Sequence, residues 1–142
     1  MFTTVVAVTG SVYKNKDGTS RQELLGTLYD DYYMEGYEDE IVLKLKPDTK
    51  NKHDENAVAV WCMEPEEAKG MLGYIPSEHA PDIKAALKRK KVRKVEFDHM
   101  GVRRGNKIWA RLVIQIRGKK EAEYGDLDLF EDEDGETFRM IG

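Results

Sequence analysis

The stretch NKHDENAV at residues 51–58 concentrates side chains that can do chemistry. Asn51 offers an amide, His53 an imidazole and Asp54 a carboxylate. A carboxylate that accepts a hydrogen bond from a hydroxyl gains roughly 1.5–3 kcal/mol, and it repels a phosphate. Such a group suits recognition of a ligand that offers a free hydroxyl rather than a phosphate. The alternative is that Asn51 and Asp54 only bond the local backbone and shape a turn.

Four aromatic side chains have their own interpretations. His53 can stack on a base or, when protonated, contact a phosphate, and it can equally be an ordinary loop histidine. Tyr74 lies in the short apolar segment MLGYI, where it serves either core packing or base stacking. Trp61 and Trp109 sit inside apolar segments and are predicted to belong to the core.

Residues 84–120 are strongly basic, with 14 Lys and Arg residues against Glu96 and Asp98. A basic stretch of this kind suits a phosphate backbone and predicts salt-sensitive binding. The alternative is a solvated helix end and a solvated hairpin tip. The candidate phosphate contacts are Lys88, Arg89, Lys90, Arg93, Arg103 and Arg104.

No pattern in the sequence predicts an enzyme. There is no nucleophile–base pair, and residues 17–20, DGTS, lack the G-K-[ST] element of a phosphate-binding loop. The three histidines lack helical ligand spacing and Cys62 is the single cysteine, so neither a metal nor another cofactor is predicted. No apolar run approaches the roughly 20 residues that span a bilayer, so we expect a cytoplasmic protein with no membrane partner.

The elements that position these residues are predicted to be short strands and two helices. Alternating or β-branched segments predict strands at residues 3–9, 39–46, 57–63, 71–75, 92–100 and 107–117, with a turn at residues 103–106. Residues 57–63 are uniformly apolar and predict a central strand. The pattern is typical of a mainly β fold with two helices, a small OB-like, partly open β-barrel.

The predicted helices cover residues 20–28 and 77–91. Thr19 or Ser20 caps the first, with a capping-box acid at Glu23. Ser77 is the candidate cap of the second, unless that helix begins at Pro81. Residues 29–37, YDDYYMEGY, are predicted to be an insertion loop, and the acidic residues 119–142 a loosely ordered tail.

Three pieces of the chain, in order, resemble the HIRAN domain, which occurs in some helicase-like DNA repair proteins and as a stand-alone bacterial or phage protein. They are VAVTGSVYKNKDGTSRQELL at residues 6–25, LKPDTKNKHDENAVAV at residues 45–60 and GYIPSEHA at residues 73–80. The central piece is similar to the family's N-x-x-D-x-N-A-hydrophobic run. The resemblance extends over a domain at residues 1–118.

The resemblance implies an OB-like barrel that binds single-stranded DNA, in the best-understood members through a free 3′ end. It implies that Asp54 accepts a hydrogen bond from the terminal hydroxyl, and that His53 and Tyr74 occupy pocket positions. The family's first strand ends with a basic and an aromatic residue that clamp the terminal nucleotide. The matching positions here are Thr9 and Gly10, and Tyr13 can substitute only if its loop bends back.

The sequence therefore leaves two alternative functions. The first is a nucleic-acid-binding module for single-stranded DNA or DNA 3′ ends. The second is a protein-interaction or inhibitory module that mimics DNA with its acidic segments, residues 29–40 and 121–136, and occupies a nucleic-acid enzyme such as a helicase or nuclease.

Overall fold

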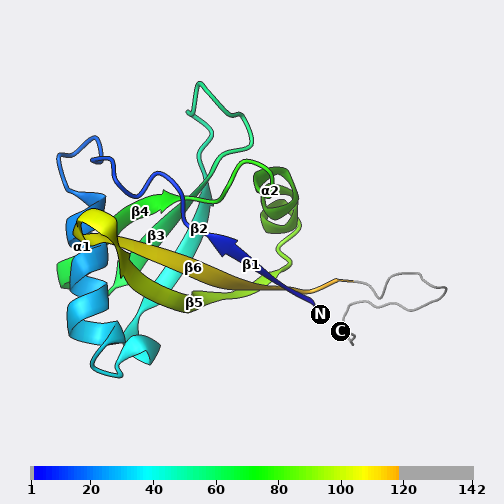
Figure 1. Ribbon diagram of the computed structural model, residues 1–142. Helices are drawn as coiled ribbons and strands as arrows, with labels where there is room; N and C mark the ends of the chain where they lie inside the picture. Colours follow the sequence, from blue (N-terminus) through cyan, green and yellow to red (C-terminus); the bar gives the residue numbers. More distant parts are fainter. Residues whose placement is uncertain (1, 119–142) are drawn as a thin grey trace.

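The computed structural model describes residues 2–118, so the predicted acidic tail at residues 119–142 lies outside the described residues. Within residues 2–118 the chain forms six strands and two α-helices, joined by loops and short helical turns (Figure 1). Their bounds are β1 (Phe2–Ala7), α1 (Arg21–Leu28), η1 (Tyr29–Tyr33), η2 (Glu38–Glu40), β2 (Val42–Pro47), β3 (Val58–Glu64), η3 (Glu66–Ala68), β4 (Gly70–Tyr74), α2 (Ala80–Lys88), β5 (Val92–Arg103), η4 (Arg104–Asn106) and β6 (Lys107–Ile116).

The described strands form two antiparallel sheets, ordered β1-β6-β5 and β2-β3-β4. Strand β3 is central in its sheet, as the apolar run predicts. Neither sheet closes into a barrel, and the arrangement is consistent with the predicted small OB-like fold. Just beyond β1, Thr9 forms an isolated antiparallel bridge with Tyr74 at the end of β4, so the first segment passes from one sheet to the other.

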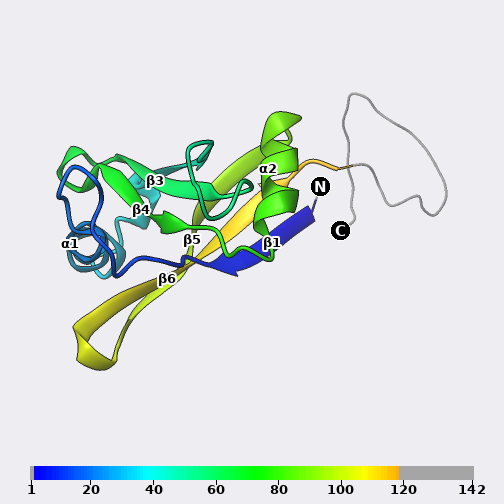
Figure 2. The ribbon, with the colours of Figure 1, turned by 90° about the horizontal axis from the view of Figure 1, so that it is seen from above.

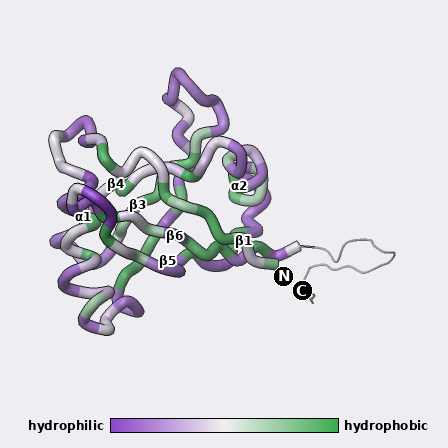
Figure 3. The backbone as a smooth tube through the Cα atoms, in the orientation of Figure 1, coloured by the Kyte–Doolittle hydropathy of each residue, from purple (hydrophilic) through white to green (hydrophobic). Residues whose placement is uncertain are grey.

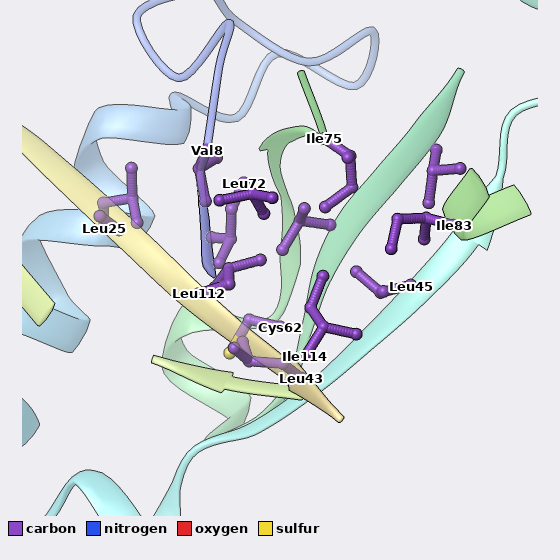
Figure 4. Packing of buried hydrophobic residues seen from close by; sticks show 14 of the residues in the cluster. Val8, Leu25, Leu43, Leu45, Cys62, Leu72, Ile75, Ile83, Leu112 and Ile114 are labelled. Atoms are coloured by element: carbon purple, nitrogen blue, oxygen red, sulfur yellow. The ribbon is translucent and has the colours of Figure 1, made fainter. Parts of the chain in front are cut away.

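The hydrophobic core lies between the two sheets and under α1 and α2 (Figure 4). In β6 the buried side chains alternate, from Ala110 through Leu112 and Ile114 to Ile116, as expected for a strand with one face on a core. The hydropathy along the backbone agrees, since the apolar residues follow the strands and the polar residues gather in the loops (Figure 3). Burying a large aliphatic side chain contributes about 1.5–3 kcal/mol, so this cluster fixes the sheets against each other.

The two helices begin differently from one another. The Ser20 hydroxyl accepts a hydrogen bond from the Glu23 amide at 3.2 Å, which confirms the predicted cap of α1. The Ser77 prediction is wrong, because α2 begins at Ala80 and its cap residue His79 makes no side-chain cap bond. Pro81 lies in the first turn, where its missing N–H costs nothing because amides there have no helical partner.

The prediction of a loop over residues 29–37 is wrong for its first half. Residues Tyr29–Tyr33 continue α1 as a π-helical turn. Tyr29 and Tyr33 pack against the core and stack on each other, with ring centroids 5.9 Å apart. This tertiary packing gives an acidic, tyrosine-rich segment a reason to stay helical.

Candidate functional site

A cleft of about 370 Å³ opens where the loop between β2 and β3 meets the end of β4. It is lined by Thr9, Asn51, His53, Asp54, Ala57, Tyr74, Ile75, Pro76, Ser77 and Glu78. The structure thus brings together four of the residues that the sequence singles out, namely Asn51, His53, Asp54 and Tyr74.

The loop that forms one wall is organised by its own polar side chains. Asn51 Oδ1 accepts the backbone N–H groups of His53 at 2.8 Å and Asp54 at 3.0 Å. Asp54 Oδ1 accepts the N–H of Asn56 at 2.9 Å. Within residues 2–118 the other carboxylate oxygen of Asp54 accepts no hydrogen bond from the protein. The turn-shaping interpretation therefore applies to Asn51 and to one oxygen of Asp54, and the second oxygen is available to a ligand.

Tyr74 forms the opposite wall and joins three segments. Its backbone exchanges two hydrogen bonds of 2.8 Å with Thr9, and its hydroxyl donates to Asp48 Oδ2 at 2.8 Å. Partial burial raises the pKa of Tyr74, and the hydrogen bond to Asp48 and the charge of that carboxylate raise it further. The phenol therefore stays neutral and keeps donating over the ordinary pH range, which holds the loop of residues 48–57 against β4.

Arg21 lies behind the cleft-lining Tyr74, and sequence reasoning did not single it out. It is only 8% exposed, at the first position of α1. Its Nη1 donates to the Gly10 carbonyl at 2.7 Å, its Nε donates to Asn15 Oδ1 at 2.8 Å, and its guanidinium lies 5.5 Å from the centroid of the Tyr74 ring. A cation in the first turn of a helix is disfavoured by the helix dipole. An arginine at this unfavourable helix position was the signal in the sequence that its side chain makes specific tertiary contacts.

A turn after β1 brings Tyr13 close to Gly10, the neighbour of the cleft-lining Thr9. Gly10 has a φ of +69°, and its carbonyl accepts the Tyr13 N–H at 3.4 Å. A Cβ at Gly10 would lie 3.4 Å from Arg21 Nη1, 3.7 Å from Tyr74 Cδ2 and 3.9 Å from Tyr13 Cδ2. One guanidinium and two aromatic rings therefore surround the position that the family pattern gives to its clamp. The Tyr13 side chain is 66% exposed.

The six basic candidates do not meet at one place. Lys88, Arg89, Lys90 and Arg93 are exposed where α2 ends and β5 begins, whereas Arg103 and Arg104 are exposed at the far end of β5. Strand β5 has 12 residues, so at about 3.3 Å per residue the two groups lie on the order of 35 Å apart. Figures 1 and 2 show the hairpin tip of β5 and β6 and the helix α2 at opposite ends of the molecule.

The described residues offer no constellation of metal ligands. Among residues 2–118, no group of three or more His, Cys, Asp or Glu side chains is placed to hold a metal ion. The same part of the chain contains no helix with the length and apolar character needed to cross a bilayer.

The two open sheets define a small OB-like β module, with a cleft where the loop between β2 and β3 meets the end of β4. The chain matches the HIRAN domain over residues 4–120 of its 142 residues, and it belongs to that family. HIRAN domains are in general DNA-binding modules, and the domain is a binding domain that is not catalytic by itself. No curated protein and no solved structure matches this chain.

Proposed function

We propose that this protein binds single-stranded DNA and receives a free 3′ end in the cleft. The observation that carries the proposal is the geometry of Asp54, which lines the cleft with one oxygen held by the Asn56 amide and the other without a protein partner in the described chain. A terminal hydroxyl donates to that second oxygen, whereas a terminal phosphate is repelled by it.

The terminal base is proposed to lie between Tyr74, His53 and Tyr13. Tyr74 and His53 line the cleft, and the exposed ring of Tyr13 lies beside Gly10 at its rim. Base–aromatic stacking is worth about 1–3 kcal/mol per base and is tolerant of sequence. Arg21 supplies the positive charge that Thr9 and Gly10 cannot supply, through the field of a guanidinium buried beneath the rim.

The basic group at the end of α2 is proposed to contact phosphates of the strand beyond the cleft. Lys88, Arg89, Lys90 and Arg93 are exposed there, and α2 is tied to the cleft loop by a 2.7 Å hydrogen bond from Lys84 Nζ to the Glu55 carbonyl. For a single strand, each phosphate contact steepens the fall of log affinity with log salt concentration by about 0.7. Removal of Arg89 and Lys90 should therefore weaken binding and flatten its salt dependence.

The test compares oligonucleotides that end in a 3′ hydroxyl or a 3′ phosphate, by fluorescence anisotropy, on the wild type and Asp54→Asn. The wild type should prefer the hydroxyl by roughly ten-fold or more, since a hydrogen bond to a charged group is worth about 1.5–3 kcal/mol. Asp54→Asn should lose the preference, because an amide can donate to a phosphate.

Glu55→Gln is the matched control, since it makes the same charge change on a neighbouring exposed residue that does not line the cleft. It should keep the preference for the hydroxyl. Equal binding of both strand ends by the wild type would show that end recognition is wrong. Failure of every oligonucleotide to bind would show that the DNA-binding function is wrong.

The second candidate function is an inhibitory module that mimics DNA toward a helicase or nuclease. The observation in its favour is the exposed acidic surface around the end of α1, formed by Asp30, Asp31, Glu38, Asp39 and Glu40. Capture of one such enzyme from the native host, by a protein that binds no oligonucleotide, would favour this function over the first.

A further inference from the structure

The outer face of the β5–β6 hairpin carries a stack of aromatic rings that the cleft does not use. The imidazole of His99 stacks on the indole of Trp109, with ring centroids 5.4 Å apart and planes 28° apart. Tyr33 meets His99 edge-on at 6.0 Å, and its hydroxyl lies 3.2 Å from His99 Nδ1. The guanidinium groups of Arg103 and Arg111 lie 6.0 Å and 5.7 Å from the Trp109 ring. These five residues are called the hairpin stack below.

The strand register explains why Trp109 lies on this face. Ala110 and Leu112 point into the core, so strand alternation places Trp109 and Arg111 on the opposite side. Gly101 is the cross-strand partner of Trp109, and a Cβ there would lie 2.7 Å from Trp109 Cζ2. The indole therefore lies over the bare backbone of Gly101 and is only partly buried. The prediction that Trp109 belongs to the core is wrong for this reason. It is wrong for Trp61 as well, which is half-buried, lies outside the core cluster and has Lys46 Nζ 4.3 Å from its ring centroid.

The same face continues to the rim of the cleft. Ala7 is the cross-strand partner of Arg111, and the Val8 amide donates to the Ala110 carbonyl at 2.9 Å. Because Val8 is buried, alternation places Ala7 and Thr9 on the outer face, and Thr9 lines the cleft. The outward face that carries Trp109 and Arg111 therefore continues through Ala7 to Thr9 at the cleft.

The charge of this face favours a polyanion. Arg103, Arg104, Lys107 and Arg111 are exposed, and residues 99–112 contain no Asp or Glu. Asp98 lies 3.7 Å from the guanidinium of Arg111 in an exposed ion pair, which is weak in water. Aromatic rings flanked by guanidinium groups are the chemistry that binds single strands, through stacking on bases and attraction of phosphates.

We propose that the hairpin stack is a second contact surface for single-stranded nucleic acid. Trp109 stacks on a base a few nucleotides from the end, and Arg103 and Arg111 bind the flanking phosphates. The inference rests on the proposed function, because the cleft holds the strand end from which those nucleotides continue. It also gives Arg103 and Arg104 a role although they lie far from the basic group at the end of α2.

The test uses Trp61→Phe, which leaves Trp109 as the single tryptophan. Trp109 emission is followed while a dinucleotide or an oligonucleotide of about ten nucleotides is added, a length within the range of one OB-type site. The longer strand should quench Trp109 and bind about ten-fold more tightly than the dinucleotide, because stacking and phosphate contacts add to the end contact. The dinucleotide should leave Trp109 emission unchanged.

The test variant carries Arg103→Ser and Arg111→Ser together. The control variant carries Lys44→Ser and Lys69→Ser, which removes the same charge from exposed residues in β2 and just before β4. The arginine variant should bind the longer strand no more tightly than the dinucleotide, whereas the lysine variant should keep the ten-fold difference in affinity. The inference is wrong, and the proposed function stands, if long strands bind without changing Trp109 emission and the arginine variant still binds them more tightly than the dinucleotide.

Two further outcomes are decisive. If polyglutamate of matched charge quenches Trp109 as strongly as the oligonucleotide, the hairpin stack is a general anion surface and the inference is overturned. If no oligonucleotide of either length binds, the proposed function itself fails.

Discussion

Replacement of Gly73 by alanine tests how the two sheets are joined beside the cleft. Gly73 is buried in β4 with a φ of +156°, and a Cβ there would lie 2.5 Å from the Thr9 carbonyl oxygen and 2.7 Å from Val8 Cγ1. A backbone oxygen cannot swing aside as the end of a side chain can, so the segment after β1 must move. Thr9 and Tyr74 exchange two backbone hydrogen bonds of 2.8 Å at this point, and the movement breaks them.

The expected cost has two parts. An alanine at positive φ costs about 1–2 kcal/mol relative to glycine. Loss of the two Thr9–Tyr74 backbone hydrogen bonds costs roughly 0.5–1.5 kcal/mol each. The free energy of unfolding should therefore fall by about 2–5 kcal/mol, a large share of the 5–15 kcal/mol typical of a domain.

The assay is urea unfolding of Gly73→Ala beside Gly18→Ala. Gly18 has a φ of +91° and nothing within 4 Å of an added Cβ, so its variant should lose only about 1–2 kcal/mol from backbone strain. Oligonucleotide affinity should also fall in Gly73→Ala under conditions where both variants are folded, because Thr9 and Tyr74 line the cleft. Equal losses of stability in the two variants would refute the close-approach argument.

Three further predictions concern single side chains. Arg21→Met should lower the free energy of unfolding by about 2–4 kcal/mol, because the Gly10 carbonyl and Asn15 Oδ1 lose charged donors; urea unfolding equal to wild type would contradict it. The Tyr32 hydroxyl donates to Glu67, which lowers the pKa of Glu67 and raises that of Tyr32 to about 12. In Tyr32→Phe, carboxyl NMR should therefore show a higher Glu67 pKa than in the wild type, and an unchanged titration would count against the pair. Since the folded pKa of Glu67 is depressed, the stabilisation it gives is present above its unfolded pKa and is lost as pH falls through the folded value. Burial raises the pKa of the Cys62 thiol to about 11, so a thiol reagent near pH 8 should label it only when denaturant unfolds the protein; rapid labelling of the native protein would disprove this.

Local patterns predicted much of the fold. All six predicted strands are present within a few residues of their predicted bounds, because alternation and β-branched runs are properties of neighbouring residues. The cap at Ser20 was also predictable, since it bonds an amide only three residues away. The HIRAN domain family was identified from the run around Asp54, and the family match confirms it.

The errors arise where packing overrides a local pattern. Residues Tyr29–Tyr33 stay helical because two rings reach the core, and Trp109 leaves the core because β6 turns its odd-numbered residues outward. Helix α2 begins at Ala80, one residue before Pro81 and not at Ser77, because residues 77–79 first form a turn.

The sequence by itself determined the loop that presents Asp54, because the side chains of Asn51 and Asp54 accept the backbone amides of Asp54 and Asn56 within six residues. Only the tertiary structure decided what surrounds that loop. Thr9 and Tyr74 are 65 residues apart in the chain, and their bridge brings the loop at Gly10, with Arg21 and Tyr13 around it, to the rim of the cleft. Such a contact depends on how two sheets pack, and no local spacing of residue types encodes it.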